Sequence, residues 1–412
     1  MKILYASTLR RTMWILLSYF ARFGFQAASF SLVARSLGSD GFGVFSATLA
    51  LTLFISPFVE LGAYTLIIRD VTVKSYPRLV LGSNLSLIFF SLPIGLLVAV
   101  GIKLILLPHI SMISFLAVAL AVFLGGRLQV IASAMNVATD KAWRNSVVEI
   151  ISGVLQTILA IVLLLMKGSV EIWCALFLAQ YLTVGIASLG WVAKDIGIET
   201  VKLTSLSRGR IWEGLSFATS TSASGTYTEI DKTLLIRFTD AHITGFYAAG
   251  FRVVLFAAIP LVAFLAAVSP RFFIEGNSSP RAAFAFAKRI MPYTLGLGLT
   301  ASVGLWFVAP LIPVVIGSDF SETPMVVRWI ALYILIQAFQ YPLADALTAS
   351  GLQTMRTVGQ IAGVAVNIGL NLWLIPVYDW RGAAFSALIT QLCLLMFFAG
   401  AWWHTLSGKH HR

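Results

Sequence analysis

Long apolar runs separated by short polar segments repeat along the whole chain. A run of about 20 residues that is almost free of charge is long enough to cross the hydrocarbon core of a bilayer as an α-helix. The pattern predicts about 12 such spans, and with them an all-α integral membrane protein. The predicted spans cover residues 13–35, 42–68, 79–102, 110–136, 147–166, 170–192, 211–237, 244–268, 291–316, 325–349, 358–377 and 383–403.

Composition favours the same class. Of the residues, 58% are hydrophobic and only 11% are charged, and the mean hydropathy is +0.89. The surface of a soluble protein of this length needs far more charge. In a soluble chain the net charge of +12 would suggest a nucleic-acid partner. Here the basic residues form no stripe and lie in alternate loops, so we predict no nucleic-acid partner.

The loop charges predict an orientation in the membrane. Lys and Arg gather before the first span and after every second span, for example at Arg69, Lys141, Lys202 and Arg281. The positive-inside rule places such loops on the cytoplasmic side. Both termini are therefore predicted to be cytoplasmic.

Matching motifs in the two halves predict an internal repeat. Arg35 followed by Gly43-Val-Phe-Ser-Ala recurs as Arg237 followed by Gly245-Phe-Tyr-Ala-Ala, at the same spacing. With six spans in each half, the two halves have the same orientation and form a parallel repeat. The predicted divisions are an N-terminal six-helix lobe over 1–193, a cytoplasmic connector over 194–210 and a C-terminal six-helix lobe over 211–412.

The sequence contains no pattern typical of a catalytic centre or a metal site. Cys174 and Cys393 both lie inside apolar spans and have no metal-ligand spacing. None of the five His residues has a Cys, Asp or Glu at such a spacing, and there is no Walker loop. We therefore predict that the protein is not an enzyme, with no catalytic residue, no metal and no cofactor.

Charged residues inside the spans are the candidate functional residues. A charge in mid-bilayer costs about 3 kcal/mol or more and normally faces a protein-lined or watery interior. Arg22 and Arg252 lie far from the ends of their spans. A guanidinium contacts phosphate in a bidentate manner and stays charged when it loses water, so these two arginines are predicted to bind an anion. Lys232 is a third candidate for that role.

Acidic residues in the same spans are candidates to balance these cations or to bind a coupling ion. Glu60 and Asp231 are the two that we select. Adjacent helical residues diverge by about 100°, so Asp231 and Lys232 are not expected to face a common partner. A pair at a helix end is the alternative for them. Arg127 and Asp345 lie nearer the inner surface. Arg127 fits a structural ion pair or a snorkelling side chain better than it fits function, and Asp345 fits both equally well.

Three segments carry a resemblance to a known family. They are Ala34-Arg-Ser-Leu-Gly38 with Gly43-Val-Phe-Ser-Ala-Thr, Tyr227-Thr-Glu-Ile-Asp231-Lys-Thr-Leu-Leu with Gly245-Phe-Tyr-Ala-Ala, and Gly382-Ala-Ala-Phe-Ser-Ala-Leu. In order and spacing the chain resembles the polysaccharide flippase group of the multidrug/oligosaccharidyl-lipid/polysaccharide exporter superfamily, the Wzx-type O-antigen and exopolysaccharide translocases. The resemblance covers essentially the whole chain.

The resemblance implies a MATE-like fold, in which two lobes enclose a cavity lined by spans one, two, seven and eight. Those spans carry Arg22, Glu60, Asp231, Lys232 and Arg252. It further implies that the substrate is an undecaprenyl-diphosphate-linked oligosaccharide, moved by alternating access across the bacterial inner membrane. A proton or sodium would be the coupling ion. Membrane lipids, a polysaccharide polymerase and export machinery are the implied partners.

Other readings compete with the flippase. A drug or cation antiporter shares the fold, but a positive cavity repels organic cations. A lipid II flippase resembles a longer chain of about 14 spans. A membrane glycan polymerase or glycosyltransferase usually has a large outer loop or an acidic metal motif, and the longest outer loop predicted here, over 317–324, is short.

Overall fold

The computed structural model describes residues 2–74, 76–197 and 208–407. Within these ranges the side chains of 2–23, 74, 89, 208, 210, 216, 217 and 219–228 lie outside the description. The described chain is helical nearly throughout and contains no strand, which confirms the all-α prediction. Contacts divide the chain into two compact units, Met1–Ser222 and Ala223–Arg412. We call them unit 1 and unit 2. The lobe limits predicted above remain predictions.

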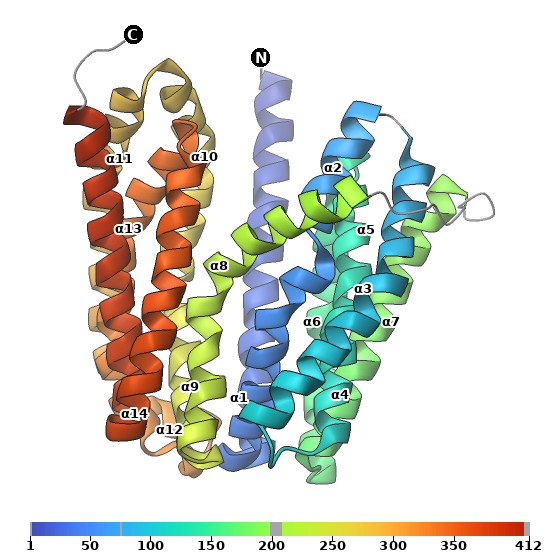
Figure 1. The fold of residues 1–412 in the computed structure, drawn as a ribbon, viewed down its shortest axis with the longest axis vertical. Helices are drawn as coiled ribbons and strands as arrows, with labels where there is room; N and C mark the ends of the chain where they lie inside the picture. Colours follow the sequence, from blue (N-terminus) through green and yellow to red (C-terminus); the bar gives the residue numbers. More distant parts are fainter. Residues whose placement is uncertain (1, 75, 198–207, 408–412) are drawn as a thin grey trace. The chain divides into compact units, whose positions relative to one another are not determined.

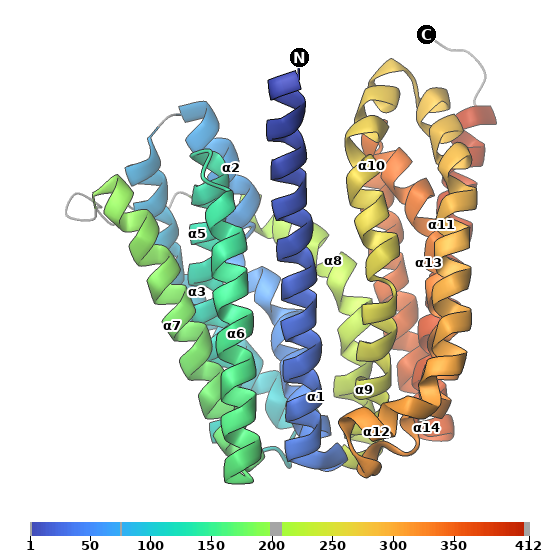
Figure 2. The same cartoon turned by 180° about the vertical axis from the view of Figure 1, so that it is seen from behind.

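Unit 1 contains α1 to α7 and the start of α8 (Figure 1). Helix α1 packs along α6, and α6 along α7 (Figure 2). Its elements are α1 (Lys2–Glu60), α2 (Ala63–Lys74), α3 (Pro77–Leu106), α4 (Met112–Leu120), the π-helix η1 (Ala121–Gly126), α5 (Arg127–Ala138), α6 (Trp143–Met166) and α7 (Val170–Ile196).

Unit 2 contains the rest of α8 and all later elements, with α13 packed against α9, α10, α11 and α14. Side chains on α11 tie it to α13, since the hydroxyls of Thr294 and Ser302 donate to the carbonyls of Ala338 and Ala331 at 2.8 and 2.7 Å. The elements are α8 (Arg208–Phe238), α9 (Ala241–Ala257), α10 (Ile259–Ser278), α11 (Pro280–Val308), η3 (Ala309–Leu311), α12 (Ile312–Ile316), η4 (Ser318–Phe320), α13 (Thr323–Ala349) and α14 (Gln353–Ser407).

Two of the long helices each contain two passes. In α1 the backbone turns at Gly38, with φ 64° and ψ −177°, a region that is essentially restricted to glycine. In α14 it turns at Asp379, with φ 52° and ψ −135°. In the described ranges, nine helices are long and apolar enough to cross a membrane. With the turns in α1 and α14 counted, each half of the described chain makes six helical passes, as the hydrophobic pattern predicted.

The second pass of each half is broken near a proline. Helix α1 gives way to α2 at Leu61 and Gly62, shortly after Pro57. Helix α9 gives way to α10 at Ala258, close to Pro260. Proline has no N–H to donate and its ring clashes with the preceding turn, so it kinks or ends a helix. The matching breaks agree with the internal repeat inferred from the motifs.

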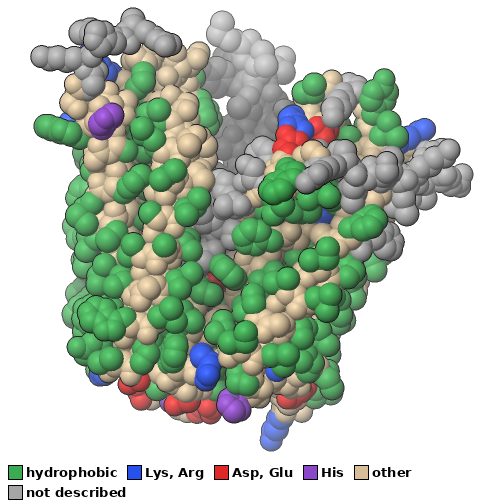
Figure 3. Space-filling model, in the orientation of Figure 1, with side chains coloured by type: hydrophobic (Ala, Val, Ile, Leu, Met, Phe, Trp, Pro, Cys, Tyr) green, Lys and Arg blue, Asp and Glu red, His purple; other side chains and the backbone are tan. Residues whose placement is uncertain are grey.

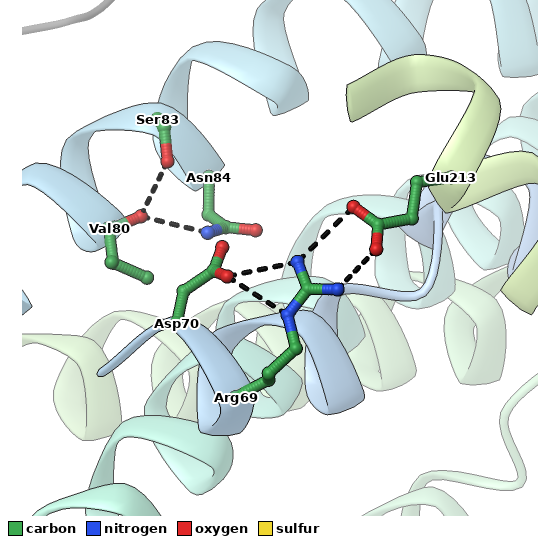
Figure 4. A network of polar contacts seen from close by, with 6 residues as sticks. All are labelled: Arg69, Asp70, Val80, Ser83, Asn84 and Glu213. Atoms are coloured by element: carbon green, nitrogen blue, oxygen red, sulfur yellow. Dashed lines mark hydrogen bonds and ion pairs between the residues drawn. The ribbon is translucent and has the colours of Figure 1, made fainter. Parts of the chain in front are cut away.

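The first turns of α8 pack against α2 inside unit 1. The guanidinium of Arg69 lies between two carboxylates: it donates to Asp70 at 3.0 and 3.1 Å and contacts both carboxylate oxygens of Glu213 (Figure 4). A Cβ at Gly214 would lie 2.7 Å from the carbonyl oxygen of Leu61. Only glycine therefore permits α8 to come this close to the backbone at Leu61. Helix α8 begins in unit 1, and its residues from Ala223 onward belong to unit 2.

The basic loops of unit 1 meet at one end. Arg78, at the start of α3, donates from Nε to the carbonyl of Ile196 at the end of α7, at 2.8 Å. Lys141, before α6, lies 2.6 Å from the carboxylate of Asp195. Apolar side chains cover the helix faces between the ends, while charged side chains gather toward the ends (Figure 3). The chain is thus a multi-pass membrane protein, and the alternate loops of unit 1 share one end as predicted.

A close crossing between η1 and α7 gives a stability test. A Cβ at Gly185 would lie 2.6 Å from the carbonyl oxygen of Gly125, and one at Gly125 would lie 2.6 Å from the backbone of Tyr181. We expect Gly185→Ala to force the helices apart and to cost about 1–3 kcal/mol. Gly190→Ala, on the same helix with open space around it, is the control. Thermal unfolding of the detergent-purified protein should show a lower midpoint for Gly185→Ala alone, and equal midpoints would contradict the crossing.

Candidate functional site

A cluster of charges is buried where α8 meets α9 in unit 2. Asp231 is 1% exposed and Lys232 is 6% exposed. The Lys232 ammonium lies 3.0 Å from the Glu229 carboxylate and 3.5 Å from that of Asp231. The Tyr247 hydroxyl donates to the other oxygen of Asp231 at 2.7 Å. We call Glu229, Asp231, Lys232 and Tyr247 the α8–α9 cluster.

Helical spacing explains how this cluster forms. Glu229 and Lys232 are three residues apart on α8 and so lie on one face. Tyr247 and Phe251 are four residues apart on α9, and the Lys232 ammonium lies 4.6 Å from the centre of the Phe251 ring. The turn between the helices ends at Asp240, whose carboxylate accepts a hydrogen bond from the backbone N–H of Ile243 and caps α9.

The expectation that Asp231 and Lys232 diverge is wrong. The 100° offset applies to the Cβ directions, but the four-carbon stem of lysine is long enough to return to its neighbour. Asp231 also accepts the backbone N–H of Lys232 at 2.8 Å, which turns its carboxylate toward that side. Both side chains therefore belong to one network.

The α8–α9 cluster holds two carboxylates and one ammonium. Lys232 is already contacted by Glu229 and Asp231, so its charge is shared within the protein. The sequence analysis did not select Glu229 as a site residue. Its i, i+3 spacing to Lys232 was the signal that could have identified it. When all three groups are ionised the cluster has an excess negative charge, which suits a small cation or a proton better than a phosphate.

The cluster adjoins the core of unit 2. The rings of Phe251 and Tyr333 lie 5.5 Å apart, edge to face. The hydroxyl of Tyr333, on α13, accepts a hydrogen bond from Gln391 on α14 at 2.9 Å. Contacts thus run from α8 through α9 and α13 to α14, and they join the buried charges to the core of the unit.

Unit 1 buries a different pair of charges, Glu60 and Arg127. Arg127 is 0% exposed, and its Nη1 donates to the hydroxyl of Ser91 at 2.6 Å. Glu60 accepts a hydrogen bond from Ser56 at 2.9 Å and interacts electrostatically with Arg127. Among the described residues, Nε and Nη2 of Arg127 have no hydrogen-bond partner.

The backbone around this pair is irregular on both sides. Arg127 directly follows the π-helix η1, and Glu60 directly precedes the break at Leu61 and Gly62. Short π-helical turns are rare and frequently lie at functional sites. The structure therefore makes Arg127, which the sequence treated mainly as structural, a stronger candidate than its position alone suggested.

Of the remaining predicted residues, Arg252 and Asp345 belong to neither of these two groups. Arg252 is half-buried on α9, one residue beyond Phe251 and so about 100° around the helix from the face that meets Lys232. No hydrogen bond or ion pair joins its guanidinium to another described residue. Asp345 pairs with Arg356 at 3.1 Å across the turn between α13 and α14, a structural tie. Arg22 lies in α1, with its side chain outside the described residues.

Within the described residues, no three His, Cys, Asp or Glu side chains come together in a way that could hold a metal ion. The two groups of buried charges remain the candidate functional features of the two units.

A comparison with models of protein families identifies the family of this chain. The model of a family described as polysaccharide biosynthesis protein matches residues 8–274, which is more than half of the chain. The chain belongs to the polysaccharide biosynthesis protein family. The matched range includes Glu60, Arg127, the α8–α9 cluster and Arg252, and it ends before Asp345. A comparison with curated protein sequences finds no match.

Solved structures show the fold of this family member. The inward closed conformation of the lipid II flippase MurJ matches with a TM-score of 0.74 and 14% identity, over 95% of this chain and 87% of that chain. An inward-facing multidrug resistance MATE transporter of the MOP superfamily matches with a TM-score of 0.71 and 11% identity, over 94% and 96%. A MOP superfamily transporter from Pyrococcus furiosus, described as having a binding pocket of reverse polarity, matches with a TM-score of 0.59 and 13% identity, over 97% and 96%. The predicted MATE-like fold is confirmed.

Removing one hydroxyl tests the α8–α9 cluster. Tyr247→Phe keeps the ring but leaves the buried Asp231 without its 2.7 Å donor. Hydrogen bonds to charged groups contribute about 1.5–3 kcal/mol, so we expect a lower thermal unfolding midpoint. Tyr293→Phe is the control, since Tyr293 is 66% exposed and its ring contact with Phe264 survives the change. If both variants unfold at the wild-type temperature, the hydrogen bond does not stabilise the cluster.

Proposed function

We propose that this member of the polysaccharide biosynthesis family is a flippase. Its substrate is an undecaprenyl-diphosphate-linked oligosaccharide, which it moves from the cytoplasmic to the periplasmic leaflet of the bacterial inner membrane for surface polysaccharide synthesis. The observation that carries the proposal is the family match over residues 8–274, joined to a fold that known flippases and transporters share. The step is transport by alternating access, without covalent chemistry and without a cofactor, so the protein is not an enzyme.

Arg22 and Arg252 are the proposed diphosphate ligands. A guanidinium remains charged at membrane depth and matches two phosphate oxygens at once. Arg252 is half-buried and has no ionic partner among the described residues, so its charge remains for an anionic substrate. Lys232, which two carboxylates already neutralise, contributes to the site through these acids rather than through direct contact with phosphate.

Ion coupling is assigned to the acidic groups of the two units. Asp231 with Glu229 in unit 2 and Glu60 with Arg127 in unit 1 are the proposed places where a proton or sodium ion binds or leaves. Binding there changes a buried charge, which is worth several kcal/mol in a medium of low dielectric constant and is enough to shift an equilibrium between two conformations. Both termini are proposed to be cytoplasmic, with membrane lipids, a polysaccharide polymerase and export machinery as partners.

A cation antiporter is the second candidate, because the α8–α9 cluster has two acids for one base. The two candidates differ in how they depend on Arg252. A half-buried guanidinium favours an anionic substrate and disfavours an organic cation. Substitution of this residue therefore separates the two functions.

The first test measures on which side the substrate lies. In vesicles that contain lipid-linked oligosaccharide, we expect the wild type to move the glycan to the periplasmic face. Arg252→Ala should slow this at least about tenfold, since a hydrogen bond to a charged group contributes about 1.5–3 kcal/mol. Arg252→Lys should fall between them, because lysine keeps the charge but not the planar fork.

Arg328→Ala is the matched control, because Arg328 is exposed and packs over the Trp306 ring at 5.7 Å. The Arg328→Ala variant should move the glycan at the wild-type rate. Equal movement of the glycan in all vesicles, including those without the protein, would refute the flippase and leave the antiporter to be tested by efflux of organic cations.

The second test concerns the coupling ion. Asp231→Asn removes the charge while keeping the shape and the contact with Tyr247. We expect the flipping rate of this variant to become independent of an imposed proton or sodium gradient, whereas Asp319→Asn, at an exposed position, keeps the wild-type response. The measurement is the ratio of initial rates with and without each gradient. A wild-type ratio in Asp231→Asn would remove Asp231 from the coupling step.

A further inference from the structure

A cavity opens at the basic end of unit 1, and neither Glu60 nor Arg127 belongs to its lining. Its volume is about 610 Å³, within the range of about 300–1,000 Å³ that is typical of small-molecule sites. It lies between the start of α3, the ends of α5 and α7 and the turn before α6. The polar residues of its lining are Tyr76, Arg78, Asn136, Thr139, Lys141 and Asp195.

Cations outnumber anions around this cavity. Lys141 and Arg144 share a single carboxylate, that of Asp195, at 2.6 and 2.5 Å. Arg78 donates to a neutral carbonyl, that of Ile196. The lining thus holds two positive side chains, Arg78 and Lys141, and one negative side chain, Asp195, which Arg144 also contacts. These contacts fasten the end of α7, but they leave an excess positive charge that faces a cavity, which is the electrostatic setting for an anion.

The aromatic residues at this end of unit 1 are typical of the depth of the lipid headgroups. Trp143 and Trp191 pack edge to face with ring centres 5.7 Å apart. The Arg144 guanidinium lies 4.7 Å from the Trp191 ring centre and 5.7 Å from that of Trp143. Tryptophan is enriched at the interface between hydrocarbon and water, where its ring spans both environments. At 59% exposure, Trp143 faces the surroundings of unit 1 rather than its core.

The rim of the cavity is apolar on one side. Leu79 is 54% exposed and Tyr76 is 64% exposed, and both follow the loop into α3. A polar, positively charged floor beside an exposed apolar rim matches a molecule whose head is an anion and whose body is hydrocarbon. Basic pockets between membrane helices on the cytoplasmic side are known places for anionic lipid headgroups.

We propose that this cavity binds the phosphate headgroup of an anionic phospholipid from the leaflet at the basic end of unit 1, with Arg78 and Lys141 as its ligands. The lining contains none of the proposed transport residues, and the proposed occupant is a resident lipid rather than the transported substrate. The same phosphate chemistry also occurs in a prenyl diphosphate, so the experiment includes both.

The test measures lipid retention on the purified full-length protein by native mass spectrometry. The probes are phosphatidylglycerol, phosphatidylcholine and a short-chain prenyl diphosphate, each added separately. We expect the wild type to retain phosphatidylglycerol in preference to phosphatidylcholine. The double variant Arg78→Gln/Lys141→Gln should lose about tenfold or more of this retention, because both proposed ligands lose their charge.

The charge-matched control is Arg281→Gln/Arg289→Gln, which removes two exposed arginines from α11 in unit 2. It should retain phosphatidylglycerol within about twofold of the wild type. Because the double variant also loosens the end of α7, Thr139→Asp is a second variant. It adds a negative charge to the lining while Arg78, Lys141 and Arg144 keep their partners, and it should lower retention as well.

Equal retention of phosphatidylglycerol by the wild type, the double variant and Thr139→Asp would overturn the proposal and leave the basic residues as a cap of α7. Retention of the prenyl diphosphate alone, lost in both cavity variants, would overturn it too and give the cavity to the transported lipid. The measurement uses no transport readout, so failure of the flippase proposal leaves its outcome unaffected.

Discussion

A charge inside a membrane-spanning helix is stable only where protein groups replace the water that it has lost. This constraint accounts for the arrangement of the polar residues in both units. Asp231 is held by the Tyr247 hydroxyl, the Lys232 ammonium and a backbone N–H. Arg127, which is fully buried, donates to Ser91 and is balanced by Glu60. Each set draws on more than one helix, so the helices cannot separate without exposing a charge to hydrocarbon.

The two halves share a framework but differ in the charges that they bury. A break near a proline divides the second pass of each half, at Leu61–Gly62 and at Ala258. Unit 1 places one acid and one base beside its break, whereas unit 2 places two acids and one base before it. An internal repeat conserves backbone geometry because helix packing depends on it, while side chains at equivalent positions are open to different functions.

Small residues and loop charges complete the architecture. Where η1 crosses α7, glycines bring the backbones into contact, and no side chain could be accommodated between them. At the basic end of unit 1, Arg78 and Lys141 close the end of α7 and also line a cavity. The side chains that hold the end of α7 are therefore also those of the proposed lipid site, because a helix C-terminus and an anionic ligand both attract cations.

Hydrophobic periodicity alone determined the helical class and the number of passes, because a bilayer requires about 20 apolar residues for each crossing. Matching sequence motifs indicated the paired halves. The hydrophobic pattern also identified Glu60, Asp231, Lys232 and Arg252 as charges at unusual depth. Which charges meet was decided by tertiary structure. The contact of Asp231 with Tyr247 joins two helices, and the role of Glu229 appears only when the Lys232 stem bends back toward it. Likewise Arg127 gains its importance from Ser91 and Glu60, which lie on other helices. Sequence spacing predicts the depth of a residue and the face of its own helix on which it lies. Contacts between helices depend on tertiary packing, which a local sequence pattern does not predict.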